Sequence, residues 1–220
     1  MSDKLYSEKL SNKISKIFGE SVDFTIDQRF FRFGRGDIIF NESDEAHSLY
    51  FMETGLVGII KTTETGSDYI LRLHGEEEFF GYRSFFSDKK YYATAMSIEE
   101  STIVRISMKS GDELFSNNNF LKFLLSDLSE KMLITEKRFT SSFDRDVKLR
   151  IAEALVFLST RYPEHRWTKK EIAEFCGSTT STVIRSMSEF EKLGLIDQSG
   201  STVNIPSITA LLKKFGAFDG

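Results

Sequence analysis

The chain has few of the residues that form disulfides or metal sites. Its 220 residues include one cysteine and three histidines. A single thiol, Cys176, excludes a disulfide within one chain and any four-cysteine cluster, and we interpret it as a packing residue. No two histidines have the spacing of metal ligands. Catalytic carboxylate pairs, nucleophile–base pairs and phosphate-binding glycine loops are also missing, so we expect neither a cofactor nor an enzyme.

Long apolar runs are missing as well. None approaches the roughly 18 residues of a membrane-spanning helix, and the N-terminus is too polar for a signal peptide, so we expect a cytoplasmic protein with no membrane partner. The formal charge is -4. The residues from Asp144 onward carry 11 basic and 10 acidic side chains, against 18 and 23 before them. The acidic excess therefore lies in the earlier part of the chain.

Short apolar segments dominate the chain from about residue 22 to residue 107. They are rich in isoleucine, valine, phenylalanine and tyrosine, and glycines such as Gly55 and Gly66 separate them. The clearest segments cover residues 37–40, 49–52, 56–61, 69–73 and 102–106. Strands of this length with glycine turns between them predict a compact antiparallel roll or barrel.

A heptad pattern follows, from about residue 118 to residue 143. Apolar and small side chains step by four and three residues along it, at Leu121, Leu125, Leu128, Met132, Thr135 and Phe139. This spacing is typical of a helix that packs along one seam. Such a helix would be on the order of 39 Å long, too long to serve only as a cap on the roll. We expect it to pair with a second copy of the chain; packing against the chain's own sheet is the alternative.

Residues 168–195 have the pattern of two short helices joined by a tight turn. Thr168 and Glu171 form a capping box that begins the first helix, and Gly177 ends it. Thr179 then caps a second helix, whose inward residues are Val183, Met187 and Phe190. Thr180, Ser181 and Arg185 lie on the opposite face, where they are free to bind phosphates and base edges. An ordinary helical hairpin is the alternative, but the turn glycine and buried valine fall at helix-turn-helix spacing.

The flanking segments complete a winged module. Leu149, Ile151, Ala152, Leu155 and Leu158 predict a preceding helix that ends before Pro163. After the two short helices, residues 195–196 and 203–205 flank Ser199-Gly200, which predicts a hairpin. We expect Pro206 to start a last helix with Ile208, Leu211 and Leu212 inward.

Four segments together resemble the transcription regulators related to the cyclic-AMP receptor protein and the fumarate-nitrate regulator, the Crp/Fnr family. They are LYFMETGLV at 49–57, FFGYRS at 79–84, DVKLRIA at 146–152, and residues 168–195. The resemblance implies an α+β fold with an N-terminal antiparallel β-roll, of the jelly-roll type that binds cyclic nucleotides. It implies an N-terminal helix (residues 1–20), the roll (21–115), a dimerisation helix (116–143) and a winged helix-turn-helix (144–220).

The resemblance further implies a homodimer bound to a palindromic operator in double-stranded DNA. By position, the family's phosphate contacts fall on Thr168, Lys169, Lys170, Thr179 and Thr182. Arg185 stands where the family commonly reads a guanine. Ser181 replaces the usual glutamate and Thr180 replaces an arginine of the cyclic-AMP receptor branch, so we expect a different operator. If the protein is an activator, RNA polymerase is a further implied partner.

The implied effector pocket departs further from the family pattern. Gly81 is kept, but Tyr82 replaces the glutamate that holds the ribose, and Tyr92-Ala93 replace the arginine-serine pair that holds the cyclic phosphate. A buried phosphate without its cation is badly compensated, so we expect no tight cyclic-AMP binding. Arg83-Ser84 could form a substitute anion clamp, with a surface ion pair of Arg83 as the alternative. Thr135 matches the helix position that touches the nucleotide base.

Other sensing mechanisms and functions remain as alternatives. The cysteine set of the fumarate-nitrate regulator is absent, which excludes its iron-sulfur mechanism. Haem would need His74 or His47 as a ligand, and lone histidines are usually polar surface residues. The effector is therefore unknown or absent. A ligand-binding adaptor whose helix-turn-helix contacts only proteins is the rival function, but it would not need Lys169, Lys170 and an exposed Arg185.

Overall fold

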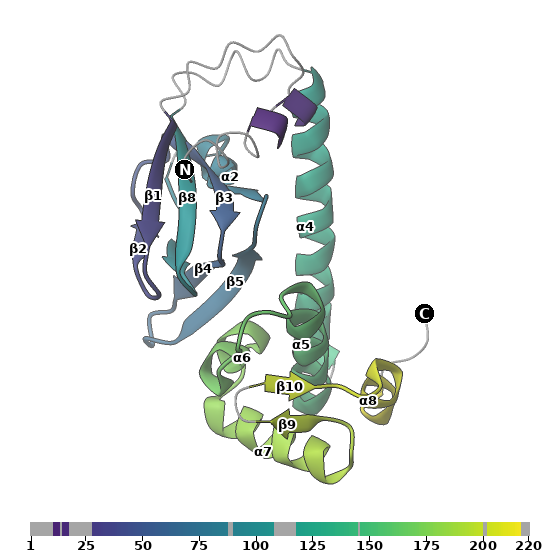
Figure 1. Ribbon diagram of the computed structural model, residues 1–220. Helices are drawn as coiled ribbons and strands as arrows, with labels where there is room; N and C mark the ends of the chain where they lie inside the picture. The colour runs from purple at the N-terminus through teal and green to yellow at the C-terminus, as the bar shows by residue number, and fades with distance from the viewer. Residues whose placement is uncertain are drawn as a thin grey trace. The chain divides into compact units, whose positions relative to one another are not determined.

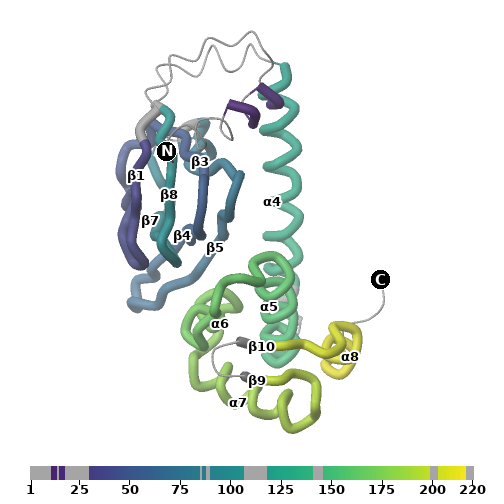
Figure 2. The backbone as a smooth tube through the Cα atoms, viewed as in Figure 1, coloured from purple at the N-terminus to yellow at the C-terminus, as the bar shows by residue number. Residues whose placement is uncertain are grey.

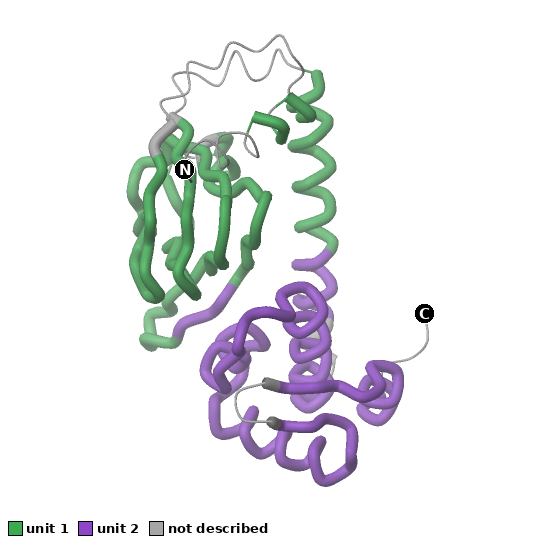
Figure 3. Tube along the Cα trace, in the orientation of Figure 1, with its two compact units in different colours: residues 1–67, 71–133 green, residues 68–70, 134–220 purple. Residues whose placement is uncertain are grey.

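The computed structural model describes residues 11–13, 15–17, 28–87, 90–107, 118–144, 146–199 and 202–216 (Figure 1). They divide into two compact units, drawn green and purple in Figure 3. The first covers residues 1–67 and 71–133, and the second covers 68–70 and 134–220. Most of the predicted N-terminal helix lies outside the described residues, although residues 11–13 and 15–17 are helical.

The first unit contains an antiparallel roll of two four-stranded sheets, as predicted. The strand order of one sheet is β1-β8-β3-β6, and β1, β8 and β3 run side by side in Figure 2. These strands are β1 (Gln28–Phe33), β8 (Ser101–Ser107), β3 (Ser48–Thr54) and β6 (Phe79–Phe80). The order of the other sheet is β2-β7-β4-β5, and its strands are β2 (Ile38–Phe40), β7 (Thr94–Ser97), β4 (Val57–Thr62) and β5 (Asp68–His74).

Strand β3 is buried on both faces, because it lies between two apolar cores. Successive strand residues point to opposite faces. Tyr50 and Met52 face a core shared with the second sheet, which contains Phe40, Ile59 and Phe80 among others. Leu49 and Phe51 face a second core, which contains Phe79, Tyr82, Val104, Ile106, Phe120 and Leu124. This double burial explains why 49–52 reads as a continuous apolar run rather than an alternating one.

The predicted long helix is α4 (Asn118–Asp144). Phe120 and Leu124 near its start are buried in the second core, and Leu128 packs against the same core. The other side of the helix is apolar and exposed: Leu125 is 64%, Met132 62% and Phe139 62% accessible to solvent. The helix therefore contributes residues to its own roll, and three apolar side chains, seven residues apart, are largely exposed to solvent.

The second unit contains the winged module. Its elements are α5 (Val147–Arg161), α6 (Lys169–Cys176), α7 (Thr180–Lys192), β9 (Asp197–Ser199), β10 (Thr202–Asn204) and α8 (Ile208–Lys214). Asp146 caps α5, because its Oδ1 accepts a hydrogen bond from the Lys148 amide at 3.1 Å. The five apolar residues predicted to face inward from α5 are all buried.

Two details of this module differ from the sequence prediction. The first strand of the hairpin begins at Asp197, because Ile196 is fully buried in the core and does not pair in the hairpin. The last helix begins at Ile208 with Ser207 as its cap, since the Ser207 hydroxyl accepts from the Ala210 amide. Leu211 is buried as predicted, but Ile208 is 43% exposed. Ile208 lies one turn before Leu211 on the same side of α8, at the exposed start of the helix.

Across the described segments, no helix has the length and apolar character needed to span a membrane.

Candidate functional site

The start of α6 is held by the predicted capping box. The Thr168 hydroxyl accepts from the Glu171 amide at 3.1 Å, and Glu171 Oε2 accepts from the Thr168 amide at 2.8 Å. His165 Nε2 lies 3.4 Å from the same carboxylate oxygen. Burial raises the pKa of Glu171, but the hydrogen bonds from His165 and Thr168 lower it by more, so its pKa lies below the ordinary value. The carboxylate is thus a charged, hydrogen-bonded anchor under the helix start.

The turn between α6 and α7 depends on one glycine and one threonine. Gly177 has φ 65° and ψ 47°, the left-handed conformation that glycine adopts without steric cost. The Thr179 hydroxyl then accepts from the Thr182 amide at 3.2 Å and caps α7. It also lies 3.0 Å from the Ser181 hydroxyl and 2.8 Å from the Thr182 hydroxyl. Three hydroxyl groups therefore cluster at the N-terminus of α7, where the helix dipole favours phosphate.

Helix α7 has one buried face and one exposed face. Val183, Met187 and Phe190 have no exposed surface, as predicted from their spacing. Thr180, Ser181 and Arg185 are exposed, and Arg185 Nη2 lies 3.4 Å from the Thr182 hydroxyl, which orients the guanidinium along the helix. Ile184 was not among the predicted site residues, yet it is 48% exposed on the same face. The sequence signal that could have identified Ile184 is its position directly before Arg185, a predicted DNA-binding residue.

The two lysines at the start of α6 have different surroundings. Lys169 Nζ donates to Gln198 Oε1 in the wing at 2.6 Å, and burial lowers the pKa of Lys169. Gln198 in turn donates to Glu191 through its side-chain amide at 3.1 Å. The Lys170 side chain is 73% exposed and lies 3.3 Å from Glu174 Oε1. Lys169 therefore links α6 to the wing, whereas Lys170 extends into solvent.

Arg138 connects the C-terminal part of α4 to α6. Its Nη2 donates to the Phe175 carbonyl at 2.5 Å, and its guanidinium carbon lies 4.1 Å from the centre of the Phe175 ring. Burial lowers the pKa of Arg138. A cation at the C-terminal end of a helix is favoured by the helix dipole. The heptad pattern did not predict a role for Arg138, because this residue lies between the seam positions Thr135 and Phe139.

Cys176, at the end of α6, has the character of a packing residue. Its thiol points back toward the Ala173 carbonyl, 3.7 Å away. Burial raises the pKa of Cys176 to about 11. A thiol with this pKa is almost entirely protonated at neutral pH and therefore a poor nucleophile.

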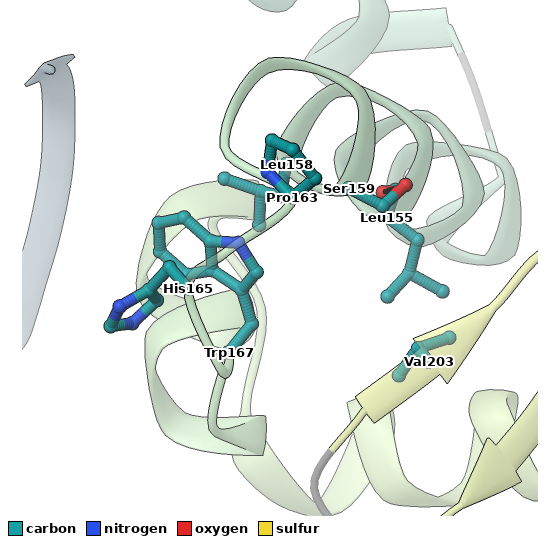
Figure 4. Close-up of a pocket in the computed structure, with 7 residues that line it drawn as sticks. All are labelled: Leu155, Leu158, Ser159, Pro163, His165, Trp167 and Val203. Atoms are coloured by element: carbon teal, nitrogen blue, oxygen red, sulfur yellow. Dashed lines mark hydrogen bonds between the residues drawn. The ribbon is translucent and has the colours of Figure 1, made fainter. Parts of the chain in front are cut away.

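A small cavity lies between α5, the segment before α6 and the wing (Figure 4). Its volume is about 60 Å³, and its lining includes Ser159, His165, Trp167 and Val203. The Trp167 indole Nε1 has no hydrogen-bond partner among the described residues. The cavity is far below the roughly 300 Å³ at which pockets for ligands of nucleotide size begin, but it has room for ordered water.

The residues predicted for the effector pocket have unlike environments. Gly81 has φ 86°, and a Cβ there would lie 2.8 Å from the Tyr50 ring, so the backbone requires glycine. Tyr82, at the start of α2 (Tyr82–Phe85), is only 4% exposed and belongs to the second core. Its hydroxyl donates to the Asp127 carboxylate on α4. Arg83 is exposed and Ser84 half-buried.

The remaining predicted pocket residues do not share the environment of Tyr82. Tyr92 is 65% exposed, and Lys61 Nζ lies 4.5 Å from the centre of its ring. Ala93 is buried in the core between the sheets, with 2% of its surface exposed. Thr135 is exposed on α4. A cyclic phosphate at the position of Tyr92-Ala93 would therefore meet an aromatic ring and a methyl group.

Two further α4 residues surround the Tyr82 hydroxyl. Lys131 Nζ lies 2.8 Å from Asp127 Oδ2 and 3.4 Å from the Tyr82 hydroxyl. Burial raises the pKa of Asp127, an effect that Lys131 opposes. Sequence reasoning did not identify Asp127 or Lys131, although their separation of four residues on a helix was a detectable signal. Together they bind the hydroxyl of Tyr82, the residue that the sequence predicts at the ribose-binding position.

Two family models match this chain. Residues 30–118 match the cyclic nucleotide-binding domain, and residues 149–214 match the Crp-like helix-turn-helix domain. These ranges cover nearly all of the roll and nearly all of the winged module. The cyclic nucleotide-binding domain precedes the helix-turn-helix domain, as expected from the sequence.

Individual relatives and a solved structure agree with the models. An uncharacterized protein of Haemophilus influenzae is 31% identical over 101 residues, which cover 46% of this chain and 78% of that protein. The anaerobic regulatory protein of Bacillus subtilis is 26% identical over 182 residues, 75% of each chain. The structure of FixK2 from Bradyrhizobium japonicum covers 88% of this chain and 99% of its own, with a TM-score of 0.77 and 18% identity, and shows the same fold. The chain belongs to the Crp/Fnr family of transcription regulators.

Proposed function

We propose that the protein is a homodimeric regulator that binds double-stranded DNA at a palindromic operator. The observation that carries this proposal is the outward face of α7, where Thr180, Ser181 and Arg185 are exposed on a helix whose other side is fully buried. A capped, polar helix of this kind fits the major groove. The hydroxyl cluster at its start and Lys170 nearby supply phosphate contacts.

Pairing along α4 is part of the same proposal. Leu125, Met132 and Phe139 recur every seven residues and are each more than 60% exposed. Exposed apolar side chains at heptad spacing are typical of a coiled-coil seam. Among the other predicted seam residues, Thr135 is exposed, Leu121 is half-buried and Leu128 packs against the roll core. A paired α4 would present two copies of α7 to successive turns of one duplex.

We infer that the roll does not bind cyclic AMP tightly. The ribose position is occupied by Tyr82, whose hydroxyl is already bound to Asp127. The phosphate position offers the exposed Tyr92 and the buried Ala93 instead of an arginine and a serine. The roll then responds to another effector or to none. An effector that favours one packing of α4 would change the affinity for DNA, and DNA would change the affinity for that effector by the same factor. Calorimetric titration with cyclic AMP should show no saturable binding.

A mobility-shift assay with operator selected from random duplexes tests DNA binding. Arg185→Ala should relax discrimination at one base pair in each half-site by about 1–3 kcal/mol, because a bidentate contact to guanine is lost. Lys137→Ala on α4 removes the same charge from an exposed position outside the proposed face and should leave discrimination intact. Equal loss on every duplex would contradict base reading by Arg185. Salt-independent binding, or none, would favour the protein-contact adaptor.

A further inference from the structure

Ile184 is an apolar residue on a face that is otherwise polar. It is 48% exposed, while the apolar residues Val183, Met187 and Phe190 of the same helix have no exposed surface. Its exposed neighbours on α7 are Thr180, Ser181, Arg185 and Ser188, at the spacing of one helix face. Ile184 therefore lies in the middle of the surface that we propose enters the major groove.

Neither folding nor solubility favours an isoleucine at this position. A β-branched side chain loses rotamer freedom in a helix, and half of this one remains in water. Residues of higher helix propensity would suit an exposed helical site better. The exposed surface of Ile184 is thus available to a partner that offers an apolar group to this face.

The major groove offers one such group. Thymine presents a C5-methyl there, beside the donors and acceptors of the other base edges. We propose that Ile184 determines part of the operator sequence by packing on the methyl group of a thymine adjacent to the guanine read by Arg185. Ile184 and Arg185 are both exposed on the outward face of α7, and stacked base pairs are only about 3.4 Å apart, so the two side chains can reach adjacent base pairs. This inference rests on the proposed DNA-binding function.

The surrounding face is consistent with methyl recognition. Its hydroxyl groups at Thr180, Ser181 and Ser188 accept or donate and so select weakly between bases. It contains no carboxylate at the position of Ser181, where the family's glutamate would accept from cytosine. Arg185 and Ile184 are then the two residues of this face with a strong preference for one base: Arg185 through hydrogen bonds to guanine, and Ile184 through apolar contact with the methyl group of thymine.

The test uses the full-length protein and the operator obtained by selection. Each thymine is replaced in turn by uracil, which lacks only the methyl group. At one thymine in each half-site, this change should weaken binding by about fourfold, the factor for burying one methyl group. Ile184→Ala, a substitution that favours the helix, should bind the thymine and uracil operators equally. Circular dichroism checks that the variant is folded.

Matched variants separate this inference from the proposed function. Ile184→Val keeps branched methyl groups and should retain most of the uracil effect, whereas Arg185→Ala should retain it while losing guanine discrimination. If the protein binds its operator selectively but no uracil substitution weakens binding, the inference is wrong and the DNA-binding function stands. An equal uracil effect in the wild type and in Ile184→Ala would also overturn it. If no duplex is bound selectively, the proposed function fails and this inference fails with it.

Discussion

Two carboxylates one turn apart on α6 respond to burial in opposite ways. Glu171 is buried but accepts hydrogen bonds from Thr168 and lies beside His165, and its pKa is lowered. Burial raises the pKa of Glu174, whose Oε1 lies 3.3 Å from Lys170 Nζ. At the residue scale, the hydrogen bonds that a carboxylate accepts affect the direction of its pKa shift more than the extent of its burial does.

These two residues predict opposite dependences of stability on pH. Because the native pKa of Glu171 is lowered, its contribution is complete above its ordinary pKa of 4.5 and is lost as pH falls through the native value. The difference in unfolding free energy between the wild type and Glu171→Ala should be about 1–3 kcal/mol at pH 7 and shrink below about pH 4.5. Urea denaturation at a series of pH values measures it.

Glu174→Ala is the matched control for this prediction. Its native pKa is raised, so protonation favours the folded state, and the advantage of the wild type over Glu174→Ala should grow as pH falls toward 4.5. Parallel curves for the two variants would show that the capping-box hydrogen bonds do not lower the pKa of Glu171.

At the scale of elements, two turns of the roll use left-handed glycines for different reasons. Gly55, between β3 and β4, has φ 93°, and a Cβ there would lie 2.5 Å from both the Glu100 carbonyl and the Ser101 hydroxyl. That hydroxyl accepts from the Leu56 amide at 3.2 Å. Gly66, between β4 and β5, has φ 79° and open space around its Cβ position. The first turn is packed against β8, and the second is not.

Alanine at these two glycines should therefore have unequal effects. Gly66→Ala should cost about 1–2 kcal/mol of unfolding free energy, the strain of a left-handed residue alone. Gly55→Ala should cost about 3–5 kcal/mol, because the backbone must move and the Ser101 hydrogen bond is lost. Chemical denaturation of the two variants tests this, and equal costs would contradict the close approach of β8 to the turn.

The exposed seam of α4 leads to a prediction about assembly. Met132→Glu should weaken self-association by more than about 100-fold, because pairing would bury two like charges. Light scattering should then give the 25.2 kDa mass of one chain where the wild type gives twice that mass. Lys137→Glu changes an exposed α4 residue off the seam and should leave the dimer intact. A monomeric wild type, or a dimeric Met132→Glu, would rule out this seam.

At the scale of the whole molecule, the salt dependence of DNA affinity depends on how many copies of the chain contact the operator. Lys170 is the more exposed of the two lysines that begin α6. Each lost phosphate contact lowers the slope of log affinity against log salt by about 1. Lys170→Ala should lower it by about 2 if two copies bind one operator, since two contacts disappear. A decrease near 1 would indicate that a single copy contacts the DNA, and an unchanged slope would exclude Lys170 from the phosphate contacts.

The sequence by itself determined the elements of this protein and their order. The capping box at Thr168, the turn at Gly177 and the inward spacing of Val183, Met187 and Phe190 are local patterns, because capping and helix periodicity depend on residues within a few positions. The five segments named from the sequence correspond to β2, β3, β4, β5 and β8, and their ends differ from the observed ones by at most two residues, whereas β1, β6 and β7 were not among them. The family resemblance depends on the same local segments.

Only the tertiary structure decided which polar groups meet across the sequence. The contact of Tyr82 with Asp127 joins residues 45 positions apart, and the contact of Lys169 with Gln198 joins residues 29 apart. The exposure of Ile184 and of Ile208 likewise depends on which face the rest of the module covers. No local pattern contains this information, because the partner of a side chain is set by chain packing rather than by its neighbours in sequence.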